Sequence, residues 1–315
     1  MMFDVNEEEI TLRLVSTFPS ALILSTFGGI WTTIGGILAV LFALFKTQSN
    51  FQSSLSLVVQ LQSGLCALLL CWSIYDVLPS AITGLSLSST LLYFISGALT
   101  TLSLSACFSR TSIVYSRFHM TTNTIRSELR RSGHVACIVV ALHNFLEGGA
   151  LCLASYKGLG ANRNVEMPSF LLITSLAIEN IPEGLLIALP LCAMHSIVES
   201  SDGSVRESQA KVAFRAVLFA GMAGFMEPFG VCVGAVLLRV LAGNVELWWG
   251  LLSAALALIA GMFCALLLCE MLPVAFKNTQ LRAFPVLSIA LGIGCLCGCT
   301  LQPLLIHYGH IPVII

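Results

Sequence analysis

The stretch "HNFLEG" near the middle of the chain combines three side chains that are common ligands of metal ions. His143 and Glu147 are four residues apart, and Asn144 lies three residues before Glu147. On a helix these side chains project from one face, within about one turn of each other. An imidazole, an amide oxygen and a carboxylate together suit a divalent first-row metal ion. The spacing therefore predicts one half of a metal site.

A second stretch, "ENIPEG", repeats the pattern with Glu179, Asn180 and Glu183. Pro182 stands directly before the second glutamate. Because Pro182 has no amide hydrogen for the carbonyl of Ile178, it is expected to kink the helix beside the ligands. Irregular backbone at membrane depth is tolerated where it lines a cavity. The proline therefore predicts room for an ion next to these carboxylates.

The surroundings of both stretches are those of a membrane protein. Of the 315 residues, 57% are hydrophobic and 10% are charged, and the mean hydropathy is +0.93. A soluble domain carries about 25% charged residues. Eight apolar runs are long enough to cross a bilayer, for which roughly 20 residues are needed. These runs lie at about 20–45, 55–79, 85–108, 135–156, 168–192, 212–240, 247–272 and 284–306. We expect an all-α, polytopic membrane protein in which residues 1–315 form a single transmembrane domain.

Several acidic residues lie inside the apolar runs, where burial of a charge in the bilayer is energetically unfavourable. Of the sixteen acidic residues, six lie inside the apolar runs: Asp76, Glu147, Glu179, Glu183, Glu227 and Glu270. A carboxylate at the bilayer centre costs about 2.5–3.5 kcal/mol on an insertion scale, and no lysine or arginine accompanies these groups at depth in the predicted runs. Either several of them are protonated, or their partner is a cation that is not part of the protein. Two centrally placed glutamates, Glu147 and Glu183, could each bridge two ions and make the site binuclear.

The doubled motif also predicts how the helices are arranged. Its two copies lie on consecutive runs that cross in opposite directions, which is typical of inverted-repeat transporters with a site at mid-membrane. Gly148, Gly149 and Gly184, which follow the motif glutamates, are expected to let these two helices approach closely. The stretch "GFMEPFG" adds a third carboxylate-bearing helix through Glu227. The second and seventh runs share an ending, "DVLP" and "EMLP". With the orientation given in the next paragraph, we expect Asp76 at the outer mouth and Glu270 at the cytoplasmic exit.

Basic residues set the expected orientation. Eleven of the fifteen lysines and arginines lie on the side opposite the N-terminus, five of them in the loop 110–134. Since cytoplasmic loops carry the excess of basic residues, this loop is predicted to be cytoplasmic and both termini extracytoplasmic. The twelve cysteines lie within or at the ends of apolar runs. The spacing of two in "CLCGC" scatters thiols around a helix, so we interpret the cysteines as packing residues rather than metal ligands.

These residues resemble the ZIP family of divalent-metal transporters (Zrt- and Irt-like proteins), and most closely its bacterial-type branch. That branch carries a histidine-asparagine-x-proline-glutamate-glycine motif on both its fourth and its fifth helix, where this chain has "HNFLEG" and "ENIPEG". "GFMEPFG" is similar to the sixth-helix motif of the branch, and "TFGGIWTTIGGIL" is similar to its glycine-rich first helix. The resemblance implies an eight-helix 3+2+3 bundle with both termini outside, metal flux toward the cytoplasm, and a homodimer.

The resemblance also assigns ligands residue by residue. One metal site would use His143, Glu147, Glu179 and Glu183, and a second would use Asn144, Glu147, Asn180, Glu183 and Glu227. The chain departs from the family motif at two positions. Leu146 replaces a proline, which leaves the fourth helix straighter, and Glu179 replaces a histidine. Since a carboxylate is a harder ligand than an imidazole, Glu179 moves the expected preference from zinc toward iron and manganese.

We expect a transporter of divalent transition-metal ions rather than an enzyme, with zinc, iron and manganese as candidate substrates and no resident cofactor. Two alternatives remain open. An intramembrane metal-dependent hydrolase would use the metal to activate water, but the histidine-glutamate-x-x-histidine pattern of common metalloproteases is absent. A proton-coupled carrier of an organic solute predicts basic or aromatic recognition groups near the site, and none is evident. The expected partners are the lipid bilayer and a second copy of the chain, without nucleic acid. The expected location is the plasma membrane, with an intracellular organelle membrane as the alternative.

Overall fold

The computed structural model of the chain describes residues 7–46, 51–115, 122–158, 170–199, 209–241 and 244–273, together with Ile289 and Ile293. These segments are helical apart from a few turn residues, and they contain no strand. In chain order the elements are α1 (Glu7–Lys46), α2 (Phe51–Trp72), η1 (Ser73–Val77), α3 (Leu78–Gly84), α4 (Leu87–Tyr115), α5 (Thr122–Gly158), α6 (Phe170–Glu199), α7 (Gln209–Val240), α8 (Val245–Ala265) and η2 (Leu266–Met271). The prediction of an all-α fold is confirmed.

Six helical segments are long and apolar enough to cross a membrane, as expected of an integral membrane protein. They are Val15–Leu44, Gln60–Gly84, Leu87–Phe108, Glu128–Leu153, Ala210–Val240 and Glu246–Met271. Each coincides with one of the predicted apolar runs. α6 occupies the predicted run 168–192 and is 30 residues long. The run 284–306 lies outside the described residues apart from two positions, so the count of eight spans stays a prediction.

The predicted loop 110–134 is mostly helical. α4 continues to Tyr115, and α5 begins at Thr122, well before the apolar run that was expected to start at 135. The first turns of α5 are charged, and hydropathy alone cannot detect a helix where it leaves the apolar layer. Their sequence "TIRSELRR" is nevertheless rich in arginine, glutamate and leucine, which have good helix propensity.

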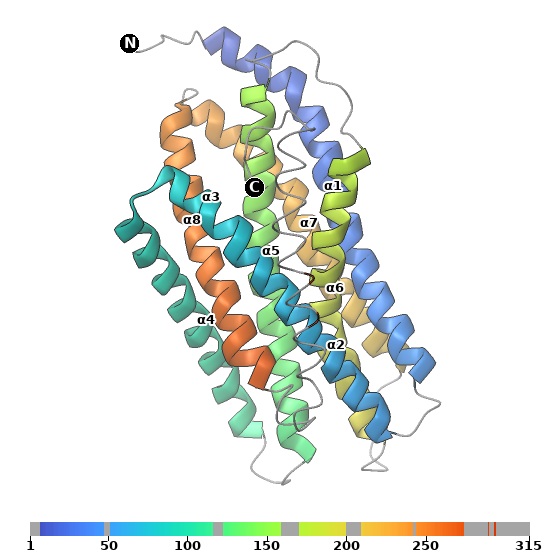
Figure 1. The fold of residues 1–315 in the computed structure, drawn as a ribbon. Helices are drawn as coiled ribbons and strands as arrows, with labels where there is room; N and C mark the ends of the chain where they lie inside the picture. The colour runs from blue at the N-terminus through green and yellow to red at the C-terminus, as the bar shows by residue number, and fades with distance from the viewer. Residues whose placement is uncertain are drawn as a thin grey trace.

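The helices pack as two groups (Figure 1). α1, α5, α6 and α7 contact one another and form one group, while α4 runs along α8 and α3 joins them in the second. α2 packs against α6 and against η2, and α5 also contacts α8. The two metal-ligand motifs, on α5 and α6, therefore both belong to the first group.

Glycines bring the helices of the first group together. A Cβ at Gly148 of α5 would collide with the backbone carbonyl of Glu227 in α7, and a Cβ at Gly184 of α6 would collide with that of Thr32 in α1. Small residues at such contacts let two helix backbones approach closely. These glycines lie against α7 and α1 and not where α5 meets α6, contrary to the expectation from the sequence.

Matching contacts recur in the two halves of this group. Gly35 of α1 lies against the carbonyl of Ile181, and Gly230 of α7 lies against the carbonyl of Phe145. Ile181 and Phe145 hold the same place in "ENIPEG" and "HNFLEG". The contacts between whole helices match as well, since α1 packs on α6 as α7 packs on α5, and α2 packs on α6 as α8 packs on α5.

The glycine and helix contacts are therefore preserved when α1 is exchanged with α7 and α5 is exchanged with α6. Where α1 and α7 meet, Gly29 and Gly224 lie against each other. In this exchange Thr32 takes the place of Glu227, since the carbonyls of these two residues lie against the equivalent glycines of α6 and α5. This pattern is the one expected of two repeats related by a two-fold axis.

Short π-helical stretches stand at the two acid–proline endings. η1 contains Asp76 of "DVLP", and η2 contains Glu270 of "EMLP". In both, a proline follows three residues after the acid. Because proline lacks an amide hydrogen and its ring clashes with the carbonyl four residues earlier, a wider turn before it relieves the clash. π-Helical turns are frequent at functional sites, and the shared feature agrees with a repeat.

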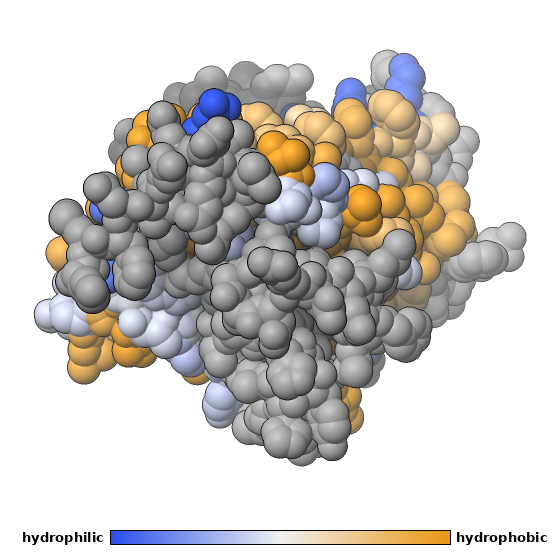
Figure 2. Space-filling model, turned by 90° about the horizontal axis from the view of Figure 1, so that it is seen from above, coloured by the Kyte–Doolittle hydropathy of each residue, from blue (hydrophilic) through white to orange (hydrophobic). Residues whose placement is uncertain are grey.

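Apolar side chains cover the outer faces of α4 and α7. Leu92 and Leu99 of α4 are 65% and 58% exposed, and Phe214 and Phe225 of α7 are 68% exposed each. Figure 2 shows apolar side chains, in orange, gathered on the flanks of the described part. A face of this kind is unfavourable in water and is the expected surface of a helix bundle in lipid.

We predict that Gly35→Ala and Gly230→Ala each destabilise the bundle by about 1–3 kcal/mol, the usual effect of overpacking. In both variants the new methyl group meets a backbone carbonyl, which cannot move aside as a flexible side chain can. Gly250→Ala is the control, because nothing lies within 4 Å of a Cβ there. The measurement is the apparent melting temperature in detergent, and equal values for all three variants would contradict the packing described here.

Candidate metal centre

His143, Glu179 and Glu183 meet in the interior of the first helix group. The His143 Nε2 lies 3.2 Å from Glu179 Oε1 and 3.5 Å from Glu183 Oε1. One ligand atom from each of the three residues lies within 4.8 Å of the others, and all three side chains are buried. The three side chains come from two antiparallel helices, α5 and α6. These three residues, which the sequence analysis placed in one ligand set, thus form a buried group that could hold a metal ion.

The helix geometry explains why these three atoms converge. Glu179 and Glu183 are one helical turn apart on α6, so both carboxylates face α5, which supplies the imidazole. Behind the imidazole, the ring of Phe263 from α8 lies edge-on at 5.1 Å between ring centroids. This contact limits rotation of the His143 ring and keeps its Nε2 directed at the carboxylates.

The two asparagines of the motifs are fully buried next to these ligands. The side-chain nitrogen of Asn144 donates to the carbonyl of Ala223 in α7 at 3.2 Å. The side-chain oxygen of Asn180 accepts from the hydroxyl of Thr32 in α1 at 3.1 Å. Asn144 Oδ1 has no hydrogen-bond partner among the described residues, and it is an oxygen that could bind a cation.

Glu227 reaches the same interior from α7. Its side chain is fully buried, and its carboxylate lies against Gly28 of α1, where a Cβ would collide with it. Neither carboxylate oxygen of Glu227 forms a hydrogen bond to a described residue. Glu227 interacts electrostatically with Glu147, Glu183 and Glu179. The predicted second site thus has its carboxylates near one another, although Glu147 and Glu227 lie outside the compact group of three.

The charges of this centre favour a cation. Within the part of the chain that the structure describes, no lysine or arginine pairs with Glu179, Glu183 or Glu227, and the only ion-pair partner of the first two is His143. One oxygen of Glu183 and both oxygens of Glu227 are buried without a hydrogen bond. Buried carboxylates in native structures are paired with a counter-charge or coordinate a metal. A nitrogen and several carboxylate oxygens fit zinc, iron or manganese.

Of the two motif positions that differ from the ZIP pattern, Glu179 belongs to the group of three ligands described above. Leu146 is partly buried and packs against the apolar core that surrounds the site. α6 runs from Phe170 to Glu199 through both Pro182 and Pro190, and Pro182 is buried beside the ligands. The kink expected at Pro182 stays a prediction.

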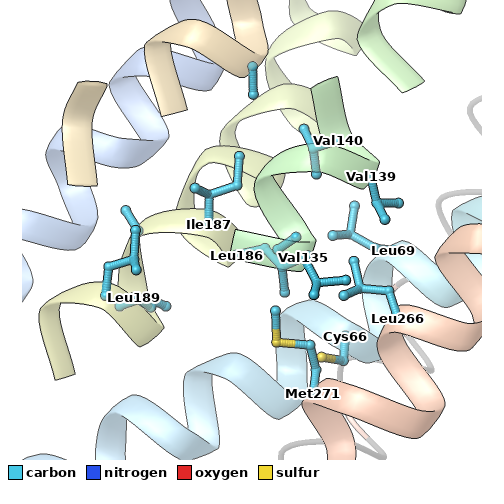
Figure 3. Packing of buried hydrophobic residues seen from close by; sticks show 14 of the residues in the cluster. Cys66, Leu69, Val135, Val139, Val140, Leu186, Ile187, Leu189, Leu266 and Met271 are labelled. Atoms are coloured by element: carbon cyan, nitrogen blue, oxygen red, sulfur yellow. The ribbon is translucent and has the colours of Figure 1, made fainter. Parts of the chain in front are cut away.

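Apolar layers lie on both sides of the site along α5. On one side, Val135 and Val139 pack with Leu186 of α6 and with Leu266 of η2, and all four are buried (Figure 3). On the other side, Leu153 belongs to a second buried cluster shared with α7 and α8. These layers separate the site from water and strengthen electrostatic interactions inside it.

Glu270, predicted to be the exit residue, has partners within the protein. Its carboxylate accepts from Arg131 Nε of α5 at 2.9 Å and from the Ser105 hydroxyl of α4. The inference that no basic residue accompanies the buried acids was wrong for Glu270. It failed because Arg131 was assigned to a loop, whereas it lies on the charged part of α5. Asp76 lies in η1, but its side chain is outside the described residues.

Several residues around the centre were not found from the sequence. Thr32 and Gly28 of α1 contact Asn180 and Glu227, and Phe263 supports His143. The glycine-rich stretch "GGIWTTIGG" is a signal for the close approach of α1. No sequence signal connects Thr32 or Phe263 to particular ligands, because such contacts depend on the packing of distant helices.

Comparison of the chain with models of known protein families and with functionally described proteins finds no match. The functional assignment therefore depends on the geometry of the centre and on the motifs that form it.

We predict that Arg131→Met destabilises the protein and that the double variant Arg131→Met/Glu270→Gln recovers much of the loss. The single change leaves a buried carboxylate without its counter-charge. The loss should lie between the roughly 1 kcal/mol of an exposed pair and the roughly 3–5 kcal/mol of a buried one, because 23% of the Arg131 side chain is exposed. Thermal unfolding in detergent measures this, with Arg130→Met on the exposed face of the same helix as the control. No recovery in the double variant would contradict the pairing.

Proposed function

We propose that the chain is a transporter of divalent transition-metal ions and that the ions cross the bilayer through the centre formed by His143, Glu179 and Glu183. The observation that carries the proposal is the convergence of three buried ligand atoms within 4.8 Å of one another. His143 lies on α5, which contains a segment long and apolar enough to span a membrane, and α1 and α7 beside the centre contain two more such segments. Buried ionisable groups inside spanning helices are characteristic of ion pathways. The resemblance of the two motifs to those of ZIP transporters supports the same function.

The proposed architecture is the eight-helix 3+2+3 bundle of that family, assembled as a homodimer in the plasma membrane with both termini extracytoplasmic. The matching contacts of α1 with α6 and of α7 with α5 support an inverted repeat. In such transporters the substrate site lies near the bilayer midplane at the interface between repeats. The convergence of α1, α5, α6 and α7 around the carboxylates agrees with this position.

The proposed mechanism is alternating access. A metal ion enters past Asp76, exchanges water for the carboxylates, and leaves past Glu270 when the two helix groups move relative to each other. Arg131 belongs to α5 of the first group, whereas Ser105 belongs to α4 of the second. The ion pair with Glu270 therefore joins the two groups, and a metal ion can use the Glu270 carboxylate only after Arg131 has separated from it.

Two other functions fit the centre less well. A metal-dependent hydrolase needs water at an open coordination position and a free general base, but apolar layers lie on both sides of this centre. A carrier of organic solutes needs groups that recognise its substrate. Among the described residues, the ligand groups beside the three glutamates Glu179, Glu183 and Glu227 are one imidazole and two amides, which suits a bare cation.

The test is uptake of zinc, iron and manganese into proteoliposomes that contain the purified protein. We predict that Glu183→Ala and Glu147→Ala each abolish uptake of all three metals, since each change would remove a bridging ligand. Glu246→Ala should retain wild-type uptake, because Glu246 is exposed at the start of α8. Size-exclusion chromatography of each variant shows whether the fold is kept. Normal uptake by either site variant, or none by the wild type, would overturn the proposal.

A further prediction concerns metal choice. Glu179→His replaces a hard oxygen ligand by a nitrogen ligand opposite His143, which should raise the preference for zinc over manganese by about tenfold, equivalent to about 1.4 kcal/mol. Overall transport should be retained. Competitive uptake of the two metals at matched protein amounts measures the ratio. An unchanged ratio would mean that Glu179 does not determine selectivity.

A further inference from the structure

Thr32 occupies a special position in the repeat. When α1 is superimposed on α7 by the repeat, Thr32 is equivalent to Glu227. One half of the repeat therefore has a hydroxyl at the position where the other half has a carboxylate. Thr32 is fully buried in the first helix group. It belongs to neither of the ligand sets that the motifs define, and among the described residues it is linked to them by its hydrogen bond to Asn180.

The surroundings of the two asparagines differ in a way that involves Thr32. Asn144 donates its amide nitrogen to the carbonyl of Ala223, which leaves its oxygen available. In the repeat, Gly28 of α1 is the equivalent of Ala223, but the amide nitrogen of Asn180 forms no hydrogen bond to the Gly28 carbonyl. The hydroxyl of Thr32 lies between them, 3.1 Å from the oxygen of Asn180 and 3.4 Å from the carbonyl oxygen of Gly28.

The buried nitrogen of Asn180 has no hydrogen-bond partner among the described residues. A hydroxyl both donates and accepts, so Thr32 can serve either end of this amide. It donates to Asn180 Oδ1 when the oxygen faces α1. When the amide turns over, the hydroxyl accepts from the nitrogen and donates to Gly28, and the amide oxygen is then free to face a cation as that of Asn144 does.

We propose that Thr32 is a positioning residue for Asn180 and that it directs the Asn180 amide oxygen to a bound metal ion. This inference rests on the proposed metal-transport function. Thr32 does not bind the ion itself. It relays the Asn180 amide to the Gly28 carbonyl, and it does in α1 what the backbone carbonyl of Ala223 does directly for Asn144. The two halves of the centre therefore use their amides equally, although of the equivalent helices α1 and α7 only α7 contributes a carboxylate.

The proposal is tested by zinc binding to the purified protein in detergent, titrated against a chelator of known affinity. Thr32→Val removes the hydroxyl at nearly constant volume. It should lower the affinity for the zinc ion that Asn180 binds by about tenfold to a hundredfold, the usual effect of losing a residue that orients a ligand. Thr32→Ser should retain wild-type affinity. Thr33→Val is the matched control, because the Thr33 hydroxyl bonds only the carbonyl of Gly29 among the described contacts. Thr32→Ala should show the same loss and replaces the valine variant if that aggregates.

A double-variant cycle separates positioning from a general effect on packing. If Thr32 acts through the amide, Thr32→Val should weaken binding in the wild type and have no effect in an Asn180→Ala background. Equal affinity of the wild type and of Thr32→Val, or equal losses in both backgrounds, would overturn the role of Thr32 alone. Failure of the wild type itself to bind zinc would overturn the proposed function and the role of Thr32 together.

Discussion

Mutual repulsion of buried carboxylates is the constraint on which the centre of this protein depends. Glu147, Glu179, Glu183 and Glu227 are each at most 4% exposed and come from three helices. A single carboxylate at the centre of a bilayer costs about 2.5–3.5 kcal/mol, and carboxylates that interact add to this cost. His143 is the only described basic side chain that pairs with Glu179 and Glu183. Positive charge from outside the chain, as metal ions or as protons, is what makes the arrangement tolerable.

Glu270 differs from the central acids because the chain itself supplies its counter-charge, the guanidinium of Arg131. Glu270 is buried like the central acids, though slightly less so, and its two oxygens accept hydrogen bonds from Arg131 and Ser105. The central carboxylates are instead held by backbone-to-backbone contacts at Gly148 and Gly184, which fix their helices against α7 and α1. Rigid helices then keep the like charges together, and a cation can bind there without displacing a lysine or arginine from a described partner.

Much of this could be predicted from the sequence, for reasons that are local. A spacing of four residues places Glu179 and Glu183 on one helix face, and apolar runs of sufficient length locate the spans. The predictions that failed concern contacts between residues far apart in the sequence, or the ends of helices. Arg131 was placed in a loop because its surroundings are charged, and Gly148 was paired with the wrong helix. The contact between Thr32 and Asn180 links residues 148 positions apart, and no local pattern indicates it.

The proposed function requires that metal binds to nitrogen and oxygen ligands in the interior of the bundle and not to the cysteines of the chain. Zinc K-edge X-ray absorption of the zinc-loaded protein distinguishes the two sites, because sulfur scatters differently from nitrogen and oxygen. We predict a first shell of nitrogen and oxygen at about 2.0–2.2 Å, with a histidine contribution and no sulfur. The same spectrum should be lost in Glu183→Ala. A shell dominated by sulfur at about 2.3 Å would place the metal on thiolates and rule out the carboxylate and histidine centre as the zinc site.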